Sequence, residues 1–423
     1  LFRSFAIALA VSSVHADERV STNDKGSLFW FPKVEIRWDQ AGNLRKDTFI
    51  SLTNDYPGTV QVQMYFVNGD PPLAADPLAA PPERAHPGWN WVDNLITLTG
   101  DQPTFWSVLT GNPAGVSPFA TALDPGFPPG RPALDGTGDR VMRGFIVGWA
   151  VNSSNRQISW NHLSGTANFI DYANSTNAEY SSFNYRSFDD LDDPTGIAGI
   201  IEMDDSDYNY SHELLLLHFQ ASGSTAMSGP VQVAHDTELT LMPCSLDVRQ
   251  ESVGPVTTKA SFEVWNQNEL KFSGAHRCIT CWDSFLLSNL EGANHFRLAT
   301  LQTNMGKARI DGLKSQLCDV DFDPNNNVDF PFPPGPADPR DPRDVVSQNT
   351  ALLGIAERIS TFPAGNGRSA NHLVGMGEDD DCVIRYDIVG PPPSNPTQIF
   401  DWLDREIRKA PRTNYTDDVQ YDD

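Results

Sequence analysis

The fold class follows from residues Thr48–Asn68, which read TFISLTNDYPGTVQVQMYFVN. Apolar and polar side chains alternate along Thr48–Thr53 and again along Thr59–Asn68, and a period of two is typical of β-strands with one buried face. Asn54–Gly58 (NDYPG) lies between the two runs and consists of residues that favour a turn. The stretch therefore predicts a β-hairpin whose inward face carries Val60, Val62, Met64 and Phe66.

Further short runs of β-favouring residues lie on both sides of this hairpin. Ser27–Phe31 and Lys33–Trp38 precede it, and Asn94–Leu98 and Phe105–Trp106 follow it. Such spacing is typical of an immunoglobulin-like sandwich. A second set of short strands begins with Arg143–Val151 (RGFIVGWAV) and predicts another sandwich or a jelly roll.

The pattern changes near Phe272. We expect a helix within Asp344–Ile359, a strand at Cys382–Ile388 and a helix that begins after Asn395. The chain as a whole is therefore predicted to be mainly β, with two immunoglobulin-like or jelly-roll-like β-sandwich domains and a smaller mixed α/β C-terminal region. The predicted segments are residues 17–135, 136–271 and 272–411, followed by an acidic tail at residues 412–423.

Residues 1–16 have the pattern of a secretory signal peptide. Arg3 precedes an apolar run from Phe5 to Val11, and small residues at Val14 and Ala16 suit a peptidase that cuts after Ala16. A short buried N-terminal element is the alternative, but polar residues follow at once. No later stretch reaches the about 20 apolar residues that a membrane helix needs. We therefore expect an exported, soluble chain in the periplasm, at the cell surface or outside the cell.

The formal net charge is −25. A chain this acidic repels nucleic acid and anionic lipid, and it attracts divalent cations or a basic partner. Solubility alone is an equally good explanation of the charge. Nucleic acid is therefore excluded as a partner, whereas calcium stays open.

Five cysteines are present, and an exported chain meets an oxidising compartment in which disulfides form. Cys278 and Cys281 have C-x-x-C spacing, with His276 two residues before them and Cys318 downstream. Two thiolates at that spacing can bind a tetrahedral metal or form a redox disulfide. Structural disulfides are favoured over both, and the odd number leaves one cysteine free or paired with another chain. The full set is Cys244, Cys278, Cys281, Cys318 and Cys382.

One acidic segment resembles the first half of a calcium-binding loop, because side-chain oxygens occur at alternate positions. It lacks the glycine at the sixth position, where Pro324 stands, and the final glutamate, where Phe330 stands. Calcium is the one cofactor that the sequence suggests. The candidate ligands are Asp319, Asp321, Asp323, Asn325 and Asn327.

Trp89, Trp91 and Trp106 lie beside Pro-rich segments. An exposed tryptophan on a β-sandwich can stack on a sugar ring, which would make these residues a carbohydrate site. Core packing is the simpler explanation. The sequence contains no nucleophile elbow, phosphate-binding loop or dinucleotide fingerprint, so a non-enzymatic protein is favoured over an enzyme.

Three segments resemble a family of uncharacterised exported bacterial proteins: Lys25–Glu35 (KGSLFWFPKVE), Thr48–Asn68, and Val264–Cys281 with the following Trp282-Asp283. The resemblance extends over most of the mature chain. It implies no activity, ligand or catalytic residue.

The leading hypothesis is an exported, non-enzymatic structural or adhesive protein of the cell envelope or extracellular space, with self-association as one version. A carbohydrate-binding protein, with a surface glycan as partner and a linked hydrolase activity as a variant, is the second hypothesis. A metal or redox protein that uses the C-x-x-C site is the third.

Overall fold

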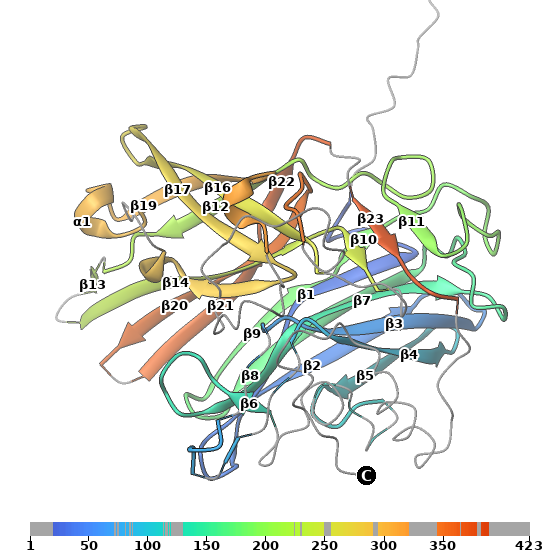
Figure 1. Ribbon diagram of the computed structural model, residues 1–423, viewed down its shortest axis with the longest axis horizontal. Helices are drawn as coiled ribbons and strands as arrows, with labels where there is room; N and C mark the ends of the chain where they lie inside the picture. Colours follow the sequence, from blue (N-terminus) through green and yellow to red (C-terminus); the bar gives the residue numbers. More distant parts are fainter. Residues whose placement is uncertain are drawn as a thin grey trace, which may run out of the picture.

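The computed structural model describes residues 20–388, except positions 72, 74–75, 81, 84–85, 87, 113, 115–116, 118, 120–129, 224, 229–230, 249–254, 291–294, 321–344, 364 and 379–381. The predicted signal peptide, the helix expected after Asn395 and the acidic tail lie outside these residues. The described chain is mainly β and is built from several antiparallel sheets, as predicted (Figure 1).

Strand β1 (Leu28–Trp38) is the centre of the N-terminal body. The two runs predicted on either side of Pro32 form this one strand, with an irregular register between Phe31 and Val34. β1 pairs along its length with β7 (Arg140–Val151), and β7 pairs on its other side with β3 (Val60–Asn68). The boundary predicted between residues 135 and 136 therefore falls within one sheet.

The N-terminal sheet folds back on itself at the corner between β1 and β2 (Leu44–Asn54). The two strands share only the pairs Arg37–Lys46 and Trp38–Leu44. Beyond this corner the sheet has two halves, which enclose a core containing Phe29, Val62 and Ile50. The first half contains β1, β7, β3, β4 (Trp91–Leu98), β6 (Arg131–Pro132) and β10 (Phe183–Tyr185), and the second contains β2, β5 (Gln102–Ser107), β8 (Leu163–Asp171) and β9 (Thr176–Ser181).

The hairpin predicted from Thr48–Asn68 is wrong, although the faces of its two strands are right. Ile50 of β2 and Met64 of β3 both point into the shared core. The strands are not hydrogen-bonded to each other, because β2 pairs with β1, β5 and β8 whereas β3 pairs with β4 and β7. Alternation shows which side chains of a strand are buried, but it does not show which strand is its neighbour. A turn between two such strands can connect neighbours in one sheet or strands in two facing layers.

The C-terminal body has two sheets that face each other across a core containing Leu217, Phe262 and Leu239. One sheet has the order β17-β16-β19-β12-β22, and the other β13-β14-β20-β21 with β18 beside β14. Because β16 pairs with β17, the predicted boundary at residues 271 and 272 also falls within a sheet. The strands are β12 (Leu214–Gln220), β13 (Thr225–Ser228), β14 (Val231–Pro243), β16 (Thr257–Asn266), β17 (Lys271–Thr280), β18 (Asp283–Leu286), β19 (Met305–Leu313), β20 (Leu352–Phe362), β21 (Gly365–His372) and β22 (Val374–Met376).

The helix predicted within Asp344–Ile359 is wrong, since β20 begins at Leu352 and pairs with β14 over ten positions. Leu352–Ala356 are all buried, so their spacing does not separate a strand from a helix, and pairing with β14 selects the strand. The helices of the described C-terminal residues are short: α1 (Leu298–Leu301), η2 (Leu287–Asn289) and η3 (Gln316–Cys318).

The two bodies share a second core on the opposite face of β1. Leu28 and Trp30 point into it, while Phe29 and Phe31 point into the first core, so β1 is buried on both faces. The Trp282 side chain enters this second core from the C-terminal body, and its Nε1 donates a hydrogen bond to the Pro32 carbonyl at 2.7 Å. An uninterrupted apolar run such as Leu28–Phe31 is typical of a strand that is covered on both sides.

A small sheet lies beside the second core. It consists of β11 (Ile200–Glu202), β23 (Val383–Arg385) and β15 (Leu246–Asp247), in which β15 and β23 run parallel. In the described ranges, no helix is long and apolar enough to cross a membrane.

Candidate functional site

Four of the five cysteines form disulfides, as favoured from the sequence. Cys244 and Cys382 are joined with a Cα–Cα distance of 5.4 Å, and both are fully buried in the second core. Cys278 of β17 is joined to Cys318 at the end of η3. Each bond connects segments far apart in the sequence, 138 and 40 residues respectively, so both restrict the unfolded chain strongly.

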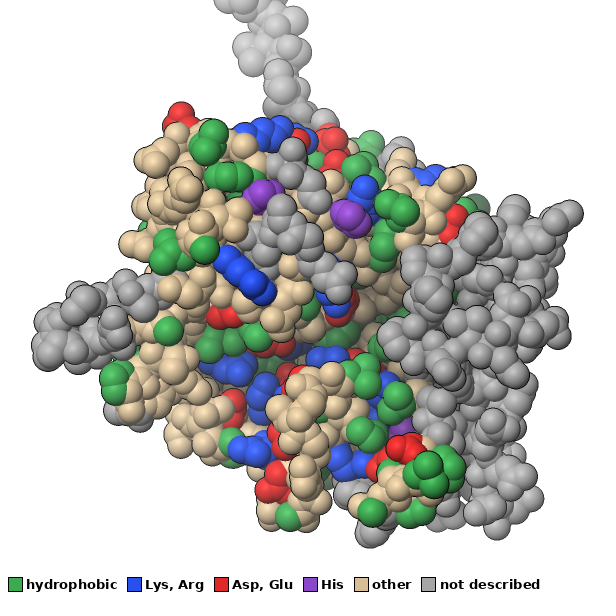
Figure 2. Space-filling model, turned by 60° about the vertical axis from the view of Figure 1, so that its left-hand side comes forward, with side chains coloured by type: hydrophobic (Ala, Val, Ile, Leu, Met, Phe, Trp, Pro, Cys, Tyr) green, Lys and Arg blue, Asp and Glu red, His purple; other side chains and the backbone are tan. Residues whose placement is uncertain are grey.

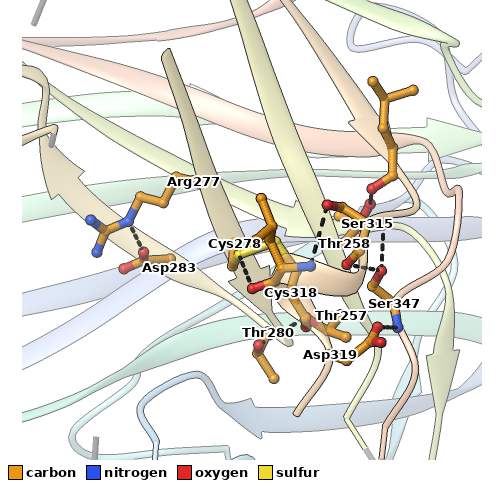
Figure 3. Close-up of a disulfide and its surroundings, with 12 residues drawn as sticks. Thr257, Thr258, Arg277, Cys278, Thr280, Asp283, Ser315, Cys318, Asp319 and Ser347 are labelled. Atoms are coloured by element: carbon orange, nitrogen blue, oxygen red, sulfur yellow. Dashed lines mark hydrogen bonds and ion pairs between the residues drawn. A yellow bond between two sulfur atoms is a disulfide. The ribbon is translucent and has the colours of Figure 1, made fainter. Parts of the chain in front are cut away.

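The Cys278–Cys318 disulfide joins β17 to the residue that ends η3 (Figure 3). Next to it, the Ser347 amide donates to Asp319 Oδ1 at 2.8 Å, and Val320 and Val345 exchange two backbone hydrogen bonds. The Ser347 hydroxyl donates to the Ser315 carbonyl at 2.7 Å. Residues 315–320 are therefore held to residues 345–347 by hydrogen bonds, and the disulfide ties Cys318 to β17.

The C-x-x-C spacing does not bring its two thiols together. Cys278 is exposed on the outer face of β17, whereas Cys281 is free and buried in the second core. His276 is also exposed on β17. No group of three or more potential metal ligands occurs in the described residues. Burial raises the pKa of the Cys281 thiol well above its ordinary value, which keeps it protonated and unreactive.

The candidate calcium ligands divide between described and undescribed residues. Asp319 is buried and accepts the Ser347 amide. Asp321, Asp323, Asn325 and Asn327 lie outside the described residues, so the calcium site stays a prediction.

The three candidate sugar-stacking tryptophans are buried. Their exposed fractions are 8% for Trp89, 6% for Trp91 and 5% for Trp106. Trp106 belongs to the first core, and Trp89 and Trp91 belong to the second. A buried indole presents no face to a sugar ring, so these residues act in packing, and the carbohydrate site predicted on them is wrong.

A charged cleft lies between the two bodies and brings together residues that the sequence did not single out. It is a narrow, partly open crevice whose interior has room for about one water molecule. Figure 2 shows a hollow across this face of the molecule with both basic and acidic side chains inside it. The lining residues are Glu35, Lys46, Asp47, Phe169, Ile170, Asp171, Thr176, Glu357 and Arg368.

Lys33 connects the two bodies beneath this cleft. Its side chain leaves β1 with only 1% exposure, and its Nζ lies 2.6 Å from Glu357 Oε1 and 3.1 Å from Glu238 Oε1. Arg368 Nη1 lies 2.9 Å from the second oxygen of Glu357. On the N-terminal body, Lys46 Nζ pairs with Glu35 Oε1 at 3.1 Å.

Three groups of this cluster, Lys33, Glu35 and Glu238, stay ionised at neutral pH. Burial favours the neutral form of the Lys33 amine, but the carboxylates of Glu238, Glu357 and Glu35 together outweigh burial and raise its pKa. Burial likewise opposes ionisation of Glu35, whereas Lys46 and Lys33 lower the pKa of its carboxyl to about 2. Lys33 and Lys46 similarly lower the pKa of Glu238. A general acid or base needs a pKa near the working pH, and these three groups are shifted away from it, so their arrangement favours a permanent ionic contact.

The sequence feature that indicates this cluster is a single charged residue within an otherwise apolar strand. Lys33 interrupts the apolar run of β1, and Glu357 follows the buried Ile355 and Ala356 of β20. A charge at a core-facing position needs a partner, but the sequence does not identify which of many acids provides it.

Two acidic stretches, Asp189–Asp193 and Asp204–Asp207, meet near Asp207. Burial, followed by the negative charges of Asp204, Glu202 and Asp189, raises the pKa of Asp207 to about 6. Asp189 Oδ2 accepts the Thr195 hydroxyl at 2.8 Å, and Asp204 accepts the Ser206 hydroxyl. The Phe188 amide donates to the Asp207 carbonyl at 3.4 Å, and Ser187 pairs with Tyr208, so the two stretches lie side by side.

No protein-family model and no curated protein matches the chain. Among solved structures, a β-glucuronidase of Ruminococcus gnavus aligns with 9% identity over 84% of this chain and 35% of its own, with a TM-score of 0.11. The chain thus spans about a third of that enzyme. A likeness this slight carries no argument about fold or activity.

Proposed function

We propose that this chain is an exported structural or adhesive protein of the cell envelope or extracellular space. The observation that supports the proposal best is the joint between its two bodies. β1 contributes to both cores, and Lys33 of the same strand pairs with Glu238 and Glu357 of the C-terminal body. Such a joint resists relative movement of the bodies, which is a property that a load-bearing or surface-exposed protein needs.

The cysteine arrangement supports export. Two disulfides close long loops, and structural disulfides persist in oxidising compartments. The remaining thiol, Cys281, is buried, so it is shielded from oxidants and from disulfide exchange. The same proposal includes two further statements: that the chain belongs to the exported family that it resembles, and that residues 1–16 are a signal peptide.

The finer fold description is also part of the proposal. We infer that each body is a β-sandwich, because each has two sheet layers around one core. A sandwich is a common architecture of extracellular modules. The proposed function includes self-association as one version. It also includes calcium binding by the segment that begins at Asp319.

The test uses the mature chain, residues 17–423. Sedimentation velocity at rising protein concentration, with and without calcium, measures self-association, and cosedimentation with isolated cell envelopes measures adhesion. We expect at least one of the two. A strict monomer under all conditions that also stays in the supernatant would contradict the proposal.

A further inference from the structure

The outer face of the half-sheet β5-β2-β8-β9 carries mostly uncharged polar side chains. Trp106, Ile50, Ala167 and Tyr180 point from these strands into the first core. Because side chains alternate along a strand, their neighbours point outward. The register places Phe105, Ser51, Thr166 and Ser181 in one row across the four strands.

The adjacent rows have the same composition. One contains Ser107, Phe49, Asn168 and Glu179, and the other contains Pro103, Thr53 and Ser164. Ser107 is buried and its hydroxyl donates to Asp47, so it offers no group to a ligand. Glu179 is the only charged side chain in the three rows, although charged residues make up 20% of the chain. Hydroxyl and amide groups therefore dominate this face.

Two phenylalanines stand among these polar groups. Phe105 is 77% exposed, and Phe49 is half-buried. A large apolar side chain that is this exposed on a regular strand gains nothing from folding, because it is left in water. The paired strands hold both rings on one face of the sheet, with the hydroxyl-bearing Ser51 and Thr166 in register with Phe105.

We propose that this face binds an extended neutral glycan, which would be the adhesive target in the function proposed above. An aromatic ring can stack on the apolar face of a pyranose, and Ser, Thr and Asn side chains both donate and accept hydrogen bonds, as sugar hydroxyls do. Neighbouring strands are about 4.8 Å apart, which is close to the rise of one sugar unit in an extended chain. Successive units could therefore meet successive strands along a row.

Because the three rows carry almost no charge, a neutral ligand fits them better than a charged one. A basic partner would find only Glu179 here, and an acidic glycan would find no cation in the three rows. A second copy of this chain is a poorer fit, because serine is depleted in protein interfaces and the face offers only two large apolar side chains. The neutral polymer matches the hydroxyls and the rings together.

The test titrates residues 17–423 with cellohexaose, chitohexaose and maltohexaose by isothermal calorimetry, with an oligogalacturonate as the acidic comparison. We expect one or more of the neutral hexasaccharides to bind and the oligogalacturonate not to bind. Phe105→Ala should weaken binding about tenfold, as expected for the loss of one stacked ring. Thr166→Lys, which places a long charged chain in the middle of the row, should abolish it.

Phe188→Ala is the matched control, because Phe188 is 44% exposed but lies outside the three rows. It should bind like the unmodified chain, and circular dichroism should show that all variants are folded. Absence of binding by every neutral hexasaccharide, or equal losses for Phe105→Ala and Phe188→Ala, would overturn the proposal. So would a loss of self-association in Phe105→Ala without glycan binding, which would identify a protein interface. Envelope adhesion and sedimentation of the unmodified chain test the proposed function independently of this face.

Discussion

Replacement of Lys33 by methionine tests whether the ionic cluster joins the two bodies. Methionine keeps most of the buried aliphatic volume but removes the ammonium group. Glu357, which is 2% exposed, then loses an ion pair of 2.6 Å, and Glu238 loses one of 3.1 Å. Removal of one partner from a buried pair costs about 3–5 kcal/mol. Arg368 still lies 2.9 Å from Glu357, so we expect the lower end, about 3 kcal/mol at neutral pH.

The stability deficit of Lys33→Met should depend on pH, and the pKa of Glu238 gives the direction of that dependence. In the unmodified protein the pKa of Glu238 lies below its ordinary value of 4.5 because of Lys33. The resulting stability is present above pH 4.5 and is lost as the pH falls below it. Without Lys33, only Lys46 and Arg368 still oppose the effect of burial, so the pKa of this carboxyl rises and protonation in acid relieves the unpaired charge. The deficit of the variant should therefore be largest at neutral pH and shrink in acid.

The assay is urea denaturation of residues 17–423, followed by tryptophan fluorescence at about pH 7 and about pH 4. Lys33→Met combined with Glu238→Gln is the matched variant, and it should recover at least about 1 kcal/mol of the loss at neutral pH. A deficit below about 1 kcal/mol, or one that is equal at both pH values, would refute the role of Lys33 as an ionic link.

Three further predictions concern the disulfides, an acid and the free thiol. Replacement of Cys244 and Cys382 together by serine should lower the free energy of unfolding by about 4 kcal/mol, measured by urea denaturation, and an unchanged midpoint would exclude a structural role. Asp207→Asn should stabilise the protein by roughly 1 kcal/mol at neutral pH after allowance for solvent screening. Because the raised pKa of Asp207 makes stability fall as the pH rises from about 4 to about 6, thermal melting of this variant should lose that slope, and a retained slope would assign it to another group. Cys281 should resist a thiol reagent in the folded chain and react in urea, whereas rapid native labelling would show that it is accessible.

The fold class and the buried faces of the strands could be read from residue alternation, because burial acts on each strand separately. Ile50, Val62 and Met64 all point into the core as expected. Strand neighbours could not be read, since β2 and β3 follow each other in sequence but lie in opposite halves of the sheet. The helix expected near Ile359 failed for a related reason: its apolar residues satisfy both periods, and pairing with β14 selects the strand.

The candidate sites show the same limit. The preference for disulfides followed from export and was right. The pairing of Cys278 with Cys318 rather than Cys281 could not be read, because Cys278 is exposed on β17 whereas Cys281 follows the end of that strand and is buried. The tryptophans are large and apolar, and only the packing shows that they are buried. Lys33, Glu238 and Glu357 come from three different strands, so no local motif marks their meeting.

Export itself is tested most directly by the intact mass of the natural protein, recovered separately from the cytoplasm and from the envelope and medium. Mass before and after alkylation under denaturing conditions gives the first residue and the number of thiols. We predict a chain that begins at Asp17, contains two disulfides and one free thiol, and is found outside the cytoplasm. A cytoplasmic chain that retains residues 1–16 and has five free thiols would contradict both the export and the function built on it.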